Sequence, residues 1–361
     1  MAFYDVGVNI TDSMFHGVYH GRPKHASDYK NVLQRAKRFH VEKILLTGSS
    51  LEESKRTLDL ASELVDSQYP ELFTTVGVHP CTVLEFLKKP DAAYDEAYYN
   101  NHLQQLKLLL NNPKVKAIGE IGLDYDRLHY TPKKEQLFFF DLQLLLVKEF
   151  NLPLFLHMRA ACDDFIDIIR KHIANWGKRD LLVHSFTGNL DELQKLIHLE
   201  AEYQNQGIRI FISVNGAGLR EYECLQVVKE IPLNRLMIET DAPWCEIKRT
   251  HPSWSYLLPA KEGFYKKDWD EIELNETKKS QCSGKKSTVT LHDVLPLPVL
   301  KPERVDKFAN ENGHIWQDSL VKARHEPCMI GMVAEVIAKV KNIHVDQIIE
   351  ATWNNSVDVF G

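Results

Sequence analysis

The chain has 361 residues, of which 44% are hydrophobic and 26% charged, a composition close to that of soluble globular proteins. Its 44 basic and 50 acidic residues give a formal charge of −6, which argues against a protein that coats nucleic acid through a general basic excess. No apolar run approaches the roughly 18 residues that a membrane-spanning helix needs, so no membrane partner is expected.

Eight short runs rich in aliphatic and β-branched residues are predicted strands. In chain order they are 4–9, 43–48, 73–79, 115–120, 153–157, 181–184, 209–215 and 235–241. Segments with helical periodicity alternate with them, at about 27–40, 51–67, 97–111, 133–150, 161–176, 189–199 and 219–230. Successive strand ends are about one βαβ unit apart. We therefore expect an α/β fold of the TIM-type (β/α)8 barrel class, although an open doubly wound sheet has the same local pattern.

The regular alternation breaks after the eighth predicted strand. Residues 245–320 are polar and rich in proline and lysine, with a low-complexity patch at 278–286. We expect a long insertion here, because barrels tolerate insertions at the C-terminal ends of their strands. Helical periodicity resumes at 326–340 and 345–357. The whole chain, 1–361, is thus predicted to be one barrel domain that contains this insertion.

Five of the eight predicted strands end in an ionisable side chain: His79, Glu120, His157, His184 and Asp241. In a barrel the C-terminal ends of all strands converge on one face. Glu120, His157, His184 and Asp241 together form a suitable set of nitrogen and oxygen ligands for a divalent ion. Each alone has a simpler explanation, such as an ion pair or a strand-ending hydrogen bond. Their joint position favours convergence around a cation.

Several motifs, in order along the chain, resemble those of the TatD family of metal-dependent deoxyribonucleases. They are Gly77-Val78-His79-Pro80, Gly119-Glu120-Ile121-Gly122-Leu123-Asp124-Tyr125, His184-Ser185-Phe186-Thr187-Gly188 and Glu239-Thr240-Asp241-Ala242-Pro243. The likeness covers residues 3–250 and roughly 320–360, and the layout is similar to that of fungal members in the eukaryotic cytosolic branch. It implies hydrolysis of phosphodiester bonds in DNA, by 3′→5′ exonuclease action with some endonuclease activity.

The resemblance also implies a role for each matching residue. Glu120 would bridge two metal positions, and His157 and His184 would complete one of them. Asp241 would bind the other ion or act as general base, and Glu239, two residues earlier on the same strand, would support that ion. His79 would lie on the substrate side, where it contacts phosphate or protonates the leaving group.

The substrate-binding candidates surround these residues. Asp124, Arg127 and Arg159 are expected to position the phosphate, for which the forked donors of arginine are suited. Lys248 and Arg249 are the best local basic pair for holding a DNA strand. Because the chain is acidic overall, single-stranded or frayed ends should fit better than intact duplex. Three aromatic residues could stack on unpaired bases: Tyr125, Tyr130 and Trp244.

Two positions depart from the family pattern. Asn9-Ile10-Thr11 stands where many members have a His-x-His pair, so one metal position should be weak or prefer magnesium. Magnesium is the expected ion for activity, with zinc or manganese as alternatives. Arg324-His325-Glu326-Pro327 replaces Arg-Asn-Glu-Pro, which leaves the hydrogen bonds of His325 undefined. Glu326 before a proline also suits a helix start.

Two other functions remain open from the residues alone. The same barrel hosts amidohydrolases and aminoacyl-tRNA deacylases, whose histidine ligands would look alike. A non-enzymatic scaffold could bind proteins through residues 245–320, although the sequence names no such partner. The six cysteines form no CxxC pair and no secretory leader is evident, so the cytosol, or the nucleus as well, is the expected location.

Overall fold

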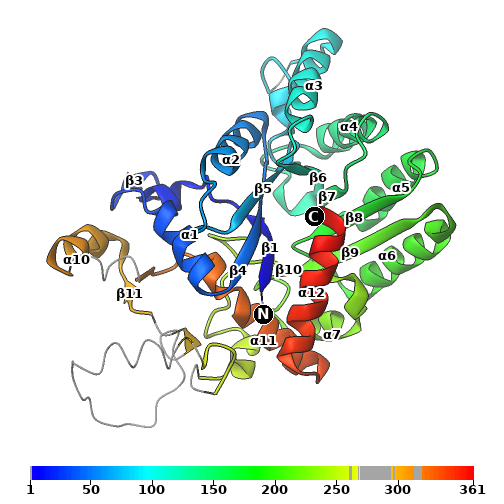
Figure 1. The fold of residues 1–361 in the computed structure, drawn as a ribbon. Coiled ribbons are helices and arrows are strands. Elements are labelled where there is room, and N and C mark those ends of the chain that lie inside the picture. Colours follow the sequence, from blue (N-terminus) through cyan, green and yellow to red (C-terminus); the bar gives the residue numbers. More distant parts are fainter. Residues whose placement is uncertain are drawn as a thin grey trace.

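The computed structural model describes residues 2–90, 92–259, 262–266, 268, 294–295, 297–312 and 319–361. Eight parallel strands form one sheet in the order β1-β4-β5-β6-β7-β8-β9-β10, and helices surround it (Figure 1). The strands are β1 (Phe3–Val8), β4 (Val41–Leu46), β5 (Glu71–Val76), β6 (Val115–Asp124), β7 (Leu154–Arg159), β8 (Arg179–His184), β9 (Ile208–Val214) and β10 (Leu236–Ile238). Each corresponds to one predicted strand.

The first and last strands of the sheet meet and close the barrel. Val8 at the end of β1 forms a parallel bridge with Ala242, which follows β10. The backbone N–H of Asn9 donates to the Ala242 carbonyl at 2.8 Å, and that of Asp241 donates to the Gly7 carbonyl at 2.9 Å. The predicted TIM-type barrel is therefore confirmed, and the open doubly wound sheet is not the fold.

Amphipathic helices cover the outside of the barrel, as the periodicity predicts (Figure 1). They are α1 (Tyr29–Arg38), α2 (Leu51–Glu63), α3 (Glu96–Leu110), α4 (Lys133–Gln143), α5 (Cys162–Ile173), α6 (Leu190–Tyr203), α7 (Tyr222–Glu230), α11 (Ile330–Lys341) and α12 (Val345–Phe360). The helix predicted over 133–150 changes at Gln143 into a 3-10 helix, Leu144–Lys148. Within the described part of the chain, no helix combines the length and apolar character that crossing a membrane requires.

Apolar side chains fill the barrel interior. Each strand contributes one or two residues to an inner apolar layer: Tyr4, Val6, Leu45, Phe73, Ala117, Phe155, Leu182, Phe211 and Met237. Val359 and Phe360 of α12 join the same cluster, which places the C-terminal helix against the interior. The ring of Phe155 stacks on that of His184 with centroids 4.4 Å apart. The apolar layer therefore lies directly beneath the imidazole of His184.

The insertion follows the eighth strand as predicted, and its described parts are anchored to the barrel. Tyr265 is fully buried and its hydroxyl donates to the Cys328 carbonyl at 2.8 Å. The Phe264 ring packs edge-on against Phe3. The low-complexity patch at 278–286 lies outside the described residues.

Several short elements have no counterpart among the predicted ones. They are the hairpin β2 (Val18–Tyr19) with β3 (Arg22–Pro23), the parallel pair β11 (Val299–Leu300) with β12 (Leu320–Val321), and α10 (Val305–Asn312). Two-residue strands give too short a pattern for periodicity to reveal.

Candidate metal centre at the barrel mouth

A bulge in β6 presents Glu120 at the mouth of the barrel. The register between β6 and β7 shifts between Ile118 and Ile121, which leaves Gly119 and Glu120 out of the regular ladder. Gly119 has φ +152°, and a Cβ there would lie 2.1 Å from the Phe155 carbonyl oxygen, so only glycine fits. The strand continues to Asp124, beyond its predicted end. A bulge re-aims a side chain, and this one turns Glu120 towards the histidines of the neighbouring strands.

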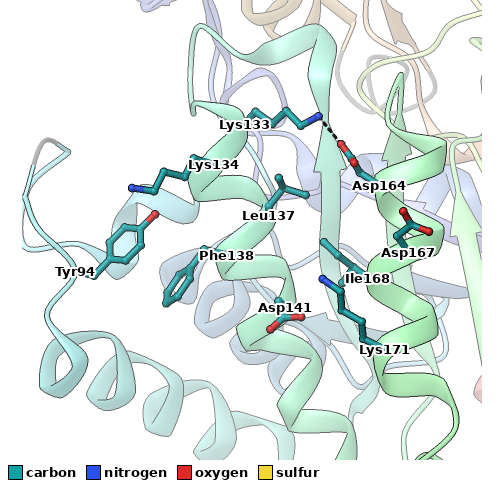
Figure 2. A pocket seen from close by; sticks show the side chains of 10 residues that line it. All are labelled: Tyr94, Lys133, Lys134, Leu137, Phe138, Asp141, Asp164, Asp167, Ile168 and Lys171. Carbon is teal, nitrogen blue, oxygen red and sulfur yellow. Dashed lines mark ion pairs between the residues drawn. The ribbon is translucent and has the colours of Figure 1, made fainter.

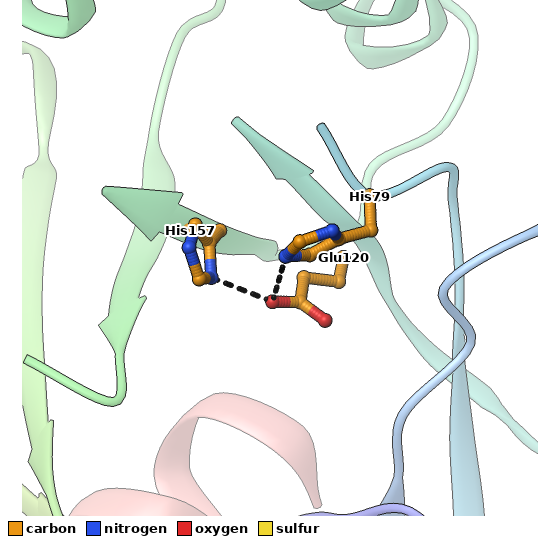
Figure 3. A group of neighbouring side chains, drawn as sticks. All are labelled: His79, Glu120 and His157. Carbon is orange, nitrogen blue, oxygen red and sulfur yellow. Dashed lines mark hydrogen bonds and ion pairs between the residues drawn. The ribbon is translucent and has the colours of Figure 1, made fainter. Parts of the chain in front are cut away.

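One carboxylate oxygen of Glu120 contacts three histidines. Its Oε1 lies 2.8 Å from His157 Nδ1 and 2.6 Å from His184 Nε2, and these two nitrogens are 3.4 Å apart. His79 Nε2 lies 3.4 Å from the same oxygen. Figure 3 shows His79 and His157 reaching Glu120 from neighbouring segments of the barrel mouth. Side chains far apart in the sequence thus meet at one point, as their positions at strand ends predict.

The cluster is an electrostatically coupled set of buried charges. Burial opposes the charge of Glu120, but His79 and His184 hold the pKa of its carboxyl well below the ordinary value. Burial likewise opposes protonation of His184, yet Glu120 and Glu239 raise its pKa well above the usual range. The pKa of His157 is also raised, since its hydrogen bonds to the carboxylates of Asp124 and Glu120 outweigh burial. Positive charge is strongly favoured around Glu120.

The residues present fit a divalent cation. The contacting atoms of Glu120, His157 and His184 all lie within 3.4 Å of one another, so one ion could bind all three. His157 Nε2 faces Asp124 Oδ2 at 3.3 Å, the carboxylate–histidine arrangement that orients a metal-binding imidazole. His184 Nδ1 is buried without a hydrogen-bond partner and has Glu239 Oε1 at 3.6 Å. The donor set is therefore compatible with a metal centre.

His79 has a different geometry from the other two histidines. Its Nδ1 accepts a hydrogen bond from the Cys81 backbone N–H at 3.0 Å. Burial lowers the pKa of His79 to about 4, so the ring is neutral and carries its proton on Nε2. That N–H points towards Glu120. His79 is therefore arranged as a hydrogen-bond donor at the mouth.

A second carboxylate group lies beside the first. Asp241 accepts from Asn9 Nδ2 at 2.9 Å and from the Cys245 thiol at 3.2 Å. Burial and the neighbouring Glu239 raise the pKa of Asp241 to about 6. Glu239 is fully buried and accepts hydrogen bonds from Ser213 and Asn215. Asn9 therefore binds the Asp241 carboxylate directly at the position where the family pattern has a histidine.

A pocket of about 670 Å³ opens next to these groups, and both basic and acidic side chains line it, the acidic ones being Asp126, Glu192, Glu221 and Glu246. Arg127, Arg159 and Lys248, three of the predicted substrate-binding residues, are among its lining residues. Arg159 Nε also pairs with Asp126 at 2.8 Å. Arg249 is exposed and does not line this pocket, and Asp124 is buried against His157 instead.

Sequence reasoning missed other polar residues of the mouth. Arg220 and His251 line the 670 Å³ pocket, and Asn215 and Ser213 hold Glu239. Asn215 does end a predicted strand, which is the same signal that identified the histidines. Arg220 falls inside the helix predicted at about 219–230, whereas α7 begins at Tyr222 and Arg220 lies in the loop before it.

The three aromatic candidates for base stacking differ in exposure. Trp244 and Tyr130 are 52% and 55% exposed. Tyr125 is half-buried, and its hydroxyl donates to Asp164 at 2.6 Å. Trp244 also lines a second pocket of about 600 Å³ with Asn9 and Arg56. Trp244 is therefore the best placed of the three to contact a ligand, because the Tyr130 ring already packs against His129 and Arg127 and the Tyr125 hydroxyl already has a partner.

A larger pocket, of about 1030 Å³, lies outside the barrel between α4 and α5 (Figure 2). Three lysines and three aspartates line it with apolar residues: Lys133, Lys134, Lys171, Asp141, Asp164 and Asp167. Lys133 pairs with Asp164 across it. These opposite charges balance one another, and no histidine lines the pocket. The candidate chemistry is therefore at the mouth of the barrel.

The returning segment after the insertion supports the turn that carries Asp241. His325 is buried, which lowers its pKa to about 4, and its Nδ1 lies 3.0 Å from both the Thr240 and Trp244 carbonyls. A neutral ring can donate one shared N–H to these oxygens. Glu326 precedes Pro327 at the start of a 3-10 helix, as expected.

Known proteins are similar to this chain in sequence and in fold. Residues 4–361 match the family model described as TatD related DNase. The chain is 36% identical to "Deoxyribonuclease Tat-D" of Saccharomyces cerevisiae, over 100% of this chain and 91% of that protein, and 35% identical to the Schizosaccharomyces pombe protein of the same name, over 99% and 96%. It is 32% identical to "3'-5' ssDNA/RNA exonuclease TatD" of Erwinia tasmaniensis, over 67% and 80%.

A solved structure shares this fold. The crystal structure of an uncharacterized amidohydrolase from Saccharomyces cerevisiae superposes with a TM-score of 0.83 at 35% identity, over the full length of both chains. With its closed barrel and its cluster of strand-end histidines and carboxylates, the chain belongs to the TatD family of deoxyribonucleases.

Proposed function

We propose that this protein is a metal-dependent deoxyribonuclease that hydrolyses phosphodiester bonds from the 3′ end of single-stranded or frayed DNA. The observation that carries the proposal is the contact of Glu120 Oε1 with both His157 Nδ1 and His184 Nε2. The names of its relatives, deoxyribonuclease in two yeasts and single-strand exonuclease in a bacterium, supply the substrate class. A secondary endonuclease activity belongs to the same proposal.

Glu120, His157 and His184 would hold the principal ion, and Asp241 and Glu239 would serve a second, weaker position. When bound, such an ion lowers the pKa of a water molecule and offsets charge on the phosphate. Magnesium is proposed for activity, with manganese and zinc also compatible with nitrogen and oxygen ligands. The Asn9 contact with Asp241 supports a weaker second position, because an amide nitrogen occupies part of that carboxylate.

The protein's own side chains would move the protons. Asp241, with its pKa raised to about 6, is ionised at neutral pH and basic enough to accept a proton from the attacking water. Asn9 and the Cys245 thiol fix its two oxygens in place. The Nε2–H of His79 would donate to the phosphate or to the departing oxygen. Arg159 and Arg127, at the edge of the pocket, would bind the phosphate.

Binding of the DNA strand would use the basic and aromatic side chains at the mouth of the barrel. Arg220 and Lys248 line the same pocket as Arg159, and Arg249 is exposed beside Lys248. Trp244 and Tyr130 present exposed rings on which unpaired bases could stack. We further propose a location in the cytosol or nucleus, because every cysteine in the described part of the chain is a free thiol.

The experiment that tests this function is metal removal followed by reconstitution. Protein stripped with a chelator should lose activity on a 5′-labelled single strand, and magnesium or manganese should restore it. The products should shorten stepwise from the 3′ end, and a phosphorothioate at that end should block them. Full activity after stripping would exclude the mechanism. Turnover of amide or aminoacyl ester substrates in place of DNA would favour the amidohydrolase or deacylase alternative.

A further inference from the structure

A thiol lies beside the candidate metal centre without a role in it. Cys81 follows β5, two residues after His79, and its side chain is partly exposed. Potential ligand atoms of His79, Cys81 and Asp124 all lie within 4.8 Å of one another. The three side chains offer a nitrogen, a sulfur and an oxygen. This set differs from the Glu120 cluster, because it alone contains a thiol.

Two buried glutamines of α4 hold the backbone of this group in place. Gln136 accepts from the Asp124 N–H at 2.8 Å and donates to the Asp124 carbonyl at 2.9 Å. Gln143 does the same for Val78, next to His79, at 2.9 Å and 3.0 Å. Both side-chain amides are fully buried. The segments that carry His79 and Asp124 are thus fixed to one helix, which leaves little ordering to be done by a ligand.

The backbone around Cys81 is fixed as well. The Cys81 N–H donates to His79 Nδ1, and the Cys81 carbonyl accepts from the Thr131 hydroxyl at 3.1 Å. The Nδ1 lone pair of His79 therefore faces Cys81, while its Nε2 points towards Glu120. A cation bound at Nδ1 would replace one backbone hydrogen bond with a metal bond.

The donor types select the kind of ion. A thiolate with an imidazole and a carboxylate is a set that zinc and cadmium bind tightly and that magnesium does not. Burial raises the pKa of Cys81 to about 12, so the sulfur is a thiol until an ion displaces its proton. Binding would form one metal–sulfur bond and release one proton to solvent, with no change of oxidation state.

We propose that His79, Cys81 and Asp124 form a second metal site, specific for thiophilic divalent cations, whose occupation inhibits the enzyme. Inhibition follows because the ion would draw Asp124 away from His157, whose ring it orients, and would hold the His79 ring by its Nδ1. The inhibitory consequence rests on the proposed nuclease function, whereas the binding of the ion does not. The same protein would then be activated by magnesium and inhibited by zinc.

The test measures binding and activity separately. Cadmium is titrated into the full-length protein with magnesium present, and thiolate-to-cadmium absorption in the ultraviolet reports binding. We expect one equivalent of signal in the wild type and its loss in Cys81→Ser. Cys224→Ser is the matched control, because Cys224 is also partly exposed at the mouth but is not part of this group. It should keep the signal.

Nuclease activity forms the second arm. Cys81→Ser should retain magnesium-dependent activity, and the zinc concentration for half-inhibition should rise at least tenfold relative to the wild type and the Cys224 variant. An unchanged cadmium signal in Cys81→Ser, or none in the wild type, would overturn the site. Equal zinc inhibition in Cys81→Ser would overturn its inhibitory role. If the protein showed no nuclease activity, the proposed function would be refuted. The cadmium absorption measurement would still decide whether the second metal site exists.

Discussion

Glu120 is the residue on which the mouth of the barrel is organised. Its carboxylate lies within 3.4 Å of His79, His157 and His184, all largely buried. The bulge that turns it inward depends on Gly119, because any side chain there would meet the Phe155 carbonyl. A single carboxylate therefore sets the charge of the cluster and supplies the central oxygen ligand.

We expect Glu120→Ala to leave less than one hundredth of wild-type nuclease activity, because the ion loses its central ligand. Circular dichroism should show a folded protein, since the barrel floor beneath the site is apolar and unchanged. Glu202→Ala is the control, a glutamate 46% exposed in a surface ion pair, and should keep full activity. Comparable activity of the two variants would remove Glu120 from the mechanism.

A buried aspartate at the closure of the barrel predicts a pH effect on stability. Burial raises the pKa of Asp5 from 3.8 to about 8, even though Thr240 donates two hydrogen bonds to it. The native state thus keeps a proton that the unfolded chain releases above pH 4. The contribution of Asp5 to the unfolding free energy should therefore fall as pH rises from about 4 to 8, by at most about 1.4 kcal/mol per unit.

Urea denaturation at about pH 5 and pH 8 measures this effect. The wild type should lose more unfolding free energy between the two pH values than Asp5→Asn, which has no proton to release. An identical loss in both proteins would show that Asp5 is ionised in the native state throughout.

Residue positions at strand ends were the part of the site that sequence could predict. His157, His184 and Glu120 follow apolar runs, and the barrel brings all such ends to one face. The partners of these residues could not be predicted in the same way. Asn9 bonding to Asp241 depends on closure between the first and last strands, 232 positions apart. Cys81 beside Asp124 depends on loop geometry that has no periodicity.

At the scale of elements, α4 lies outside the barrel and fixes two backbone segments at the barrel mouth. Gln136 and Gln143 lie two turns apart on its buried face, and each pairs with both backbone groups of one residue at a strand end. A polar residue on the buried face of an amphipathic helix is unusual, and here it satisfies backbone groups that the strand ladder leaves unpaired. The helix therefore fixes two loops of the site.

We predict that Gln136→Leu lowers both stability and kcat. The change leaves the Asp124 N–H and the carbonyls of Asp124 and Thr131 without partners, at a cost of about 1–3 kcal/mol for each buried group. Asp124 should also shift relative to His157. The control is Gln104→Leu on the exposed side of α3. Unfolding curves and steady-state kinetics that do not distinguish these variants would contradict this role for α4.

The eight strands and nine of the helices follow from periodicity, because each buries one face against the barrel. The C-terminal limit of β6 does not, since the strand predicted over 115–120 stops before Gly122, and neither Gly119 nor Gly122 ends the strand. Both glycines instead let β6 pass close to β7, where a Cβ would lie about 2 Å from the carbonyls of Phe155 and His157. The two-residue strands, which are too short to show a periodic pattern, and α10 are also absent from the predicted elements.

At the scale of the whole molecule, a buried network of charged side chains joins the segment around α1 to the segment that follows the insertion. Arg324 donates to both oxygens of Asp28 at 2.7 Å and to Glu326 at 2.8 Å. Arg35 of α1 donates to Glu326 at 2.9 Å. All four side chains are at most 2% exposed. The segment that returns from the insertion is thereby fixed to the first helix of the barrel.

Arg324→Leu should reduce the unfolding free energy by about 3–5 kcal/mol, because it leaves the carboxylates of Asp28 and Glu326 in the interior with one fewer cation. Arg170→Leu, which breaks an ion pair with Glu202 on the surface, should cost less than about 1 kcal/mol. Chemical denaturation of both variants provides the comparison. Similar losses would mean that the buried network contributes no more than a surface pair.

The most direct test of the metal centre is anomalous diffraction from crystals of active protein grown with manganese. The predicted result is a strong peak bound by Glu120, His157 and His184, with ligand distances of about 2.0–2.3 Å, and its loss in Glu120→Ala. Crystals of active, manganese-loaded protein with no ion at this position would contradict the account.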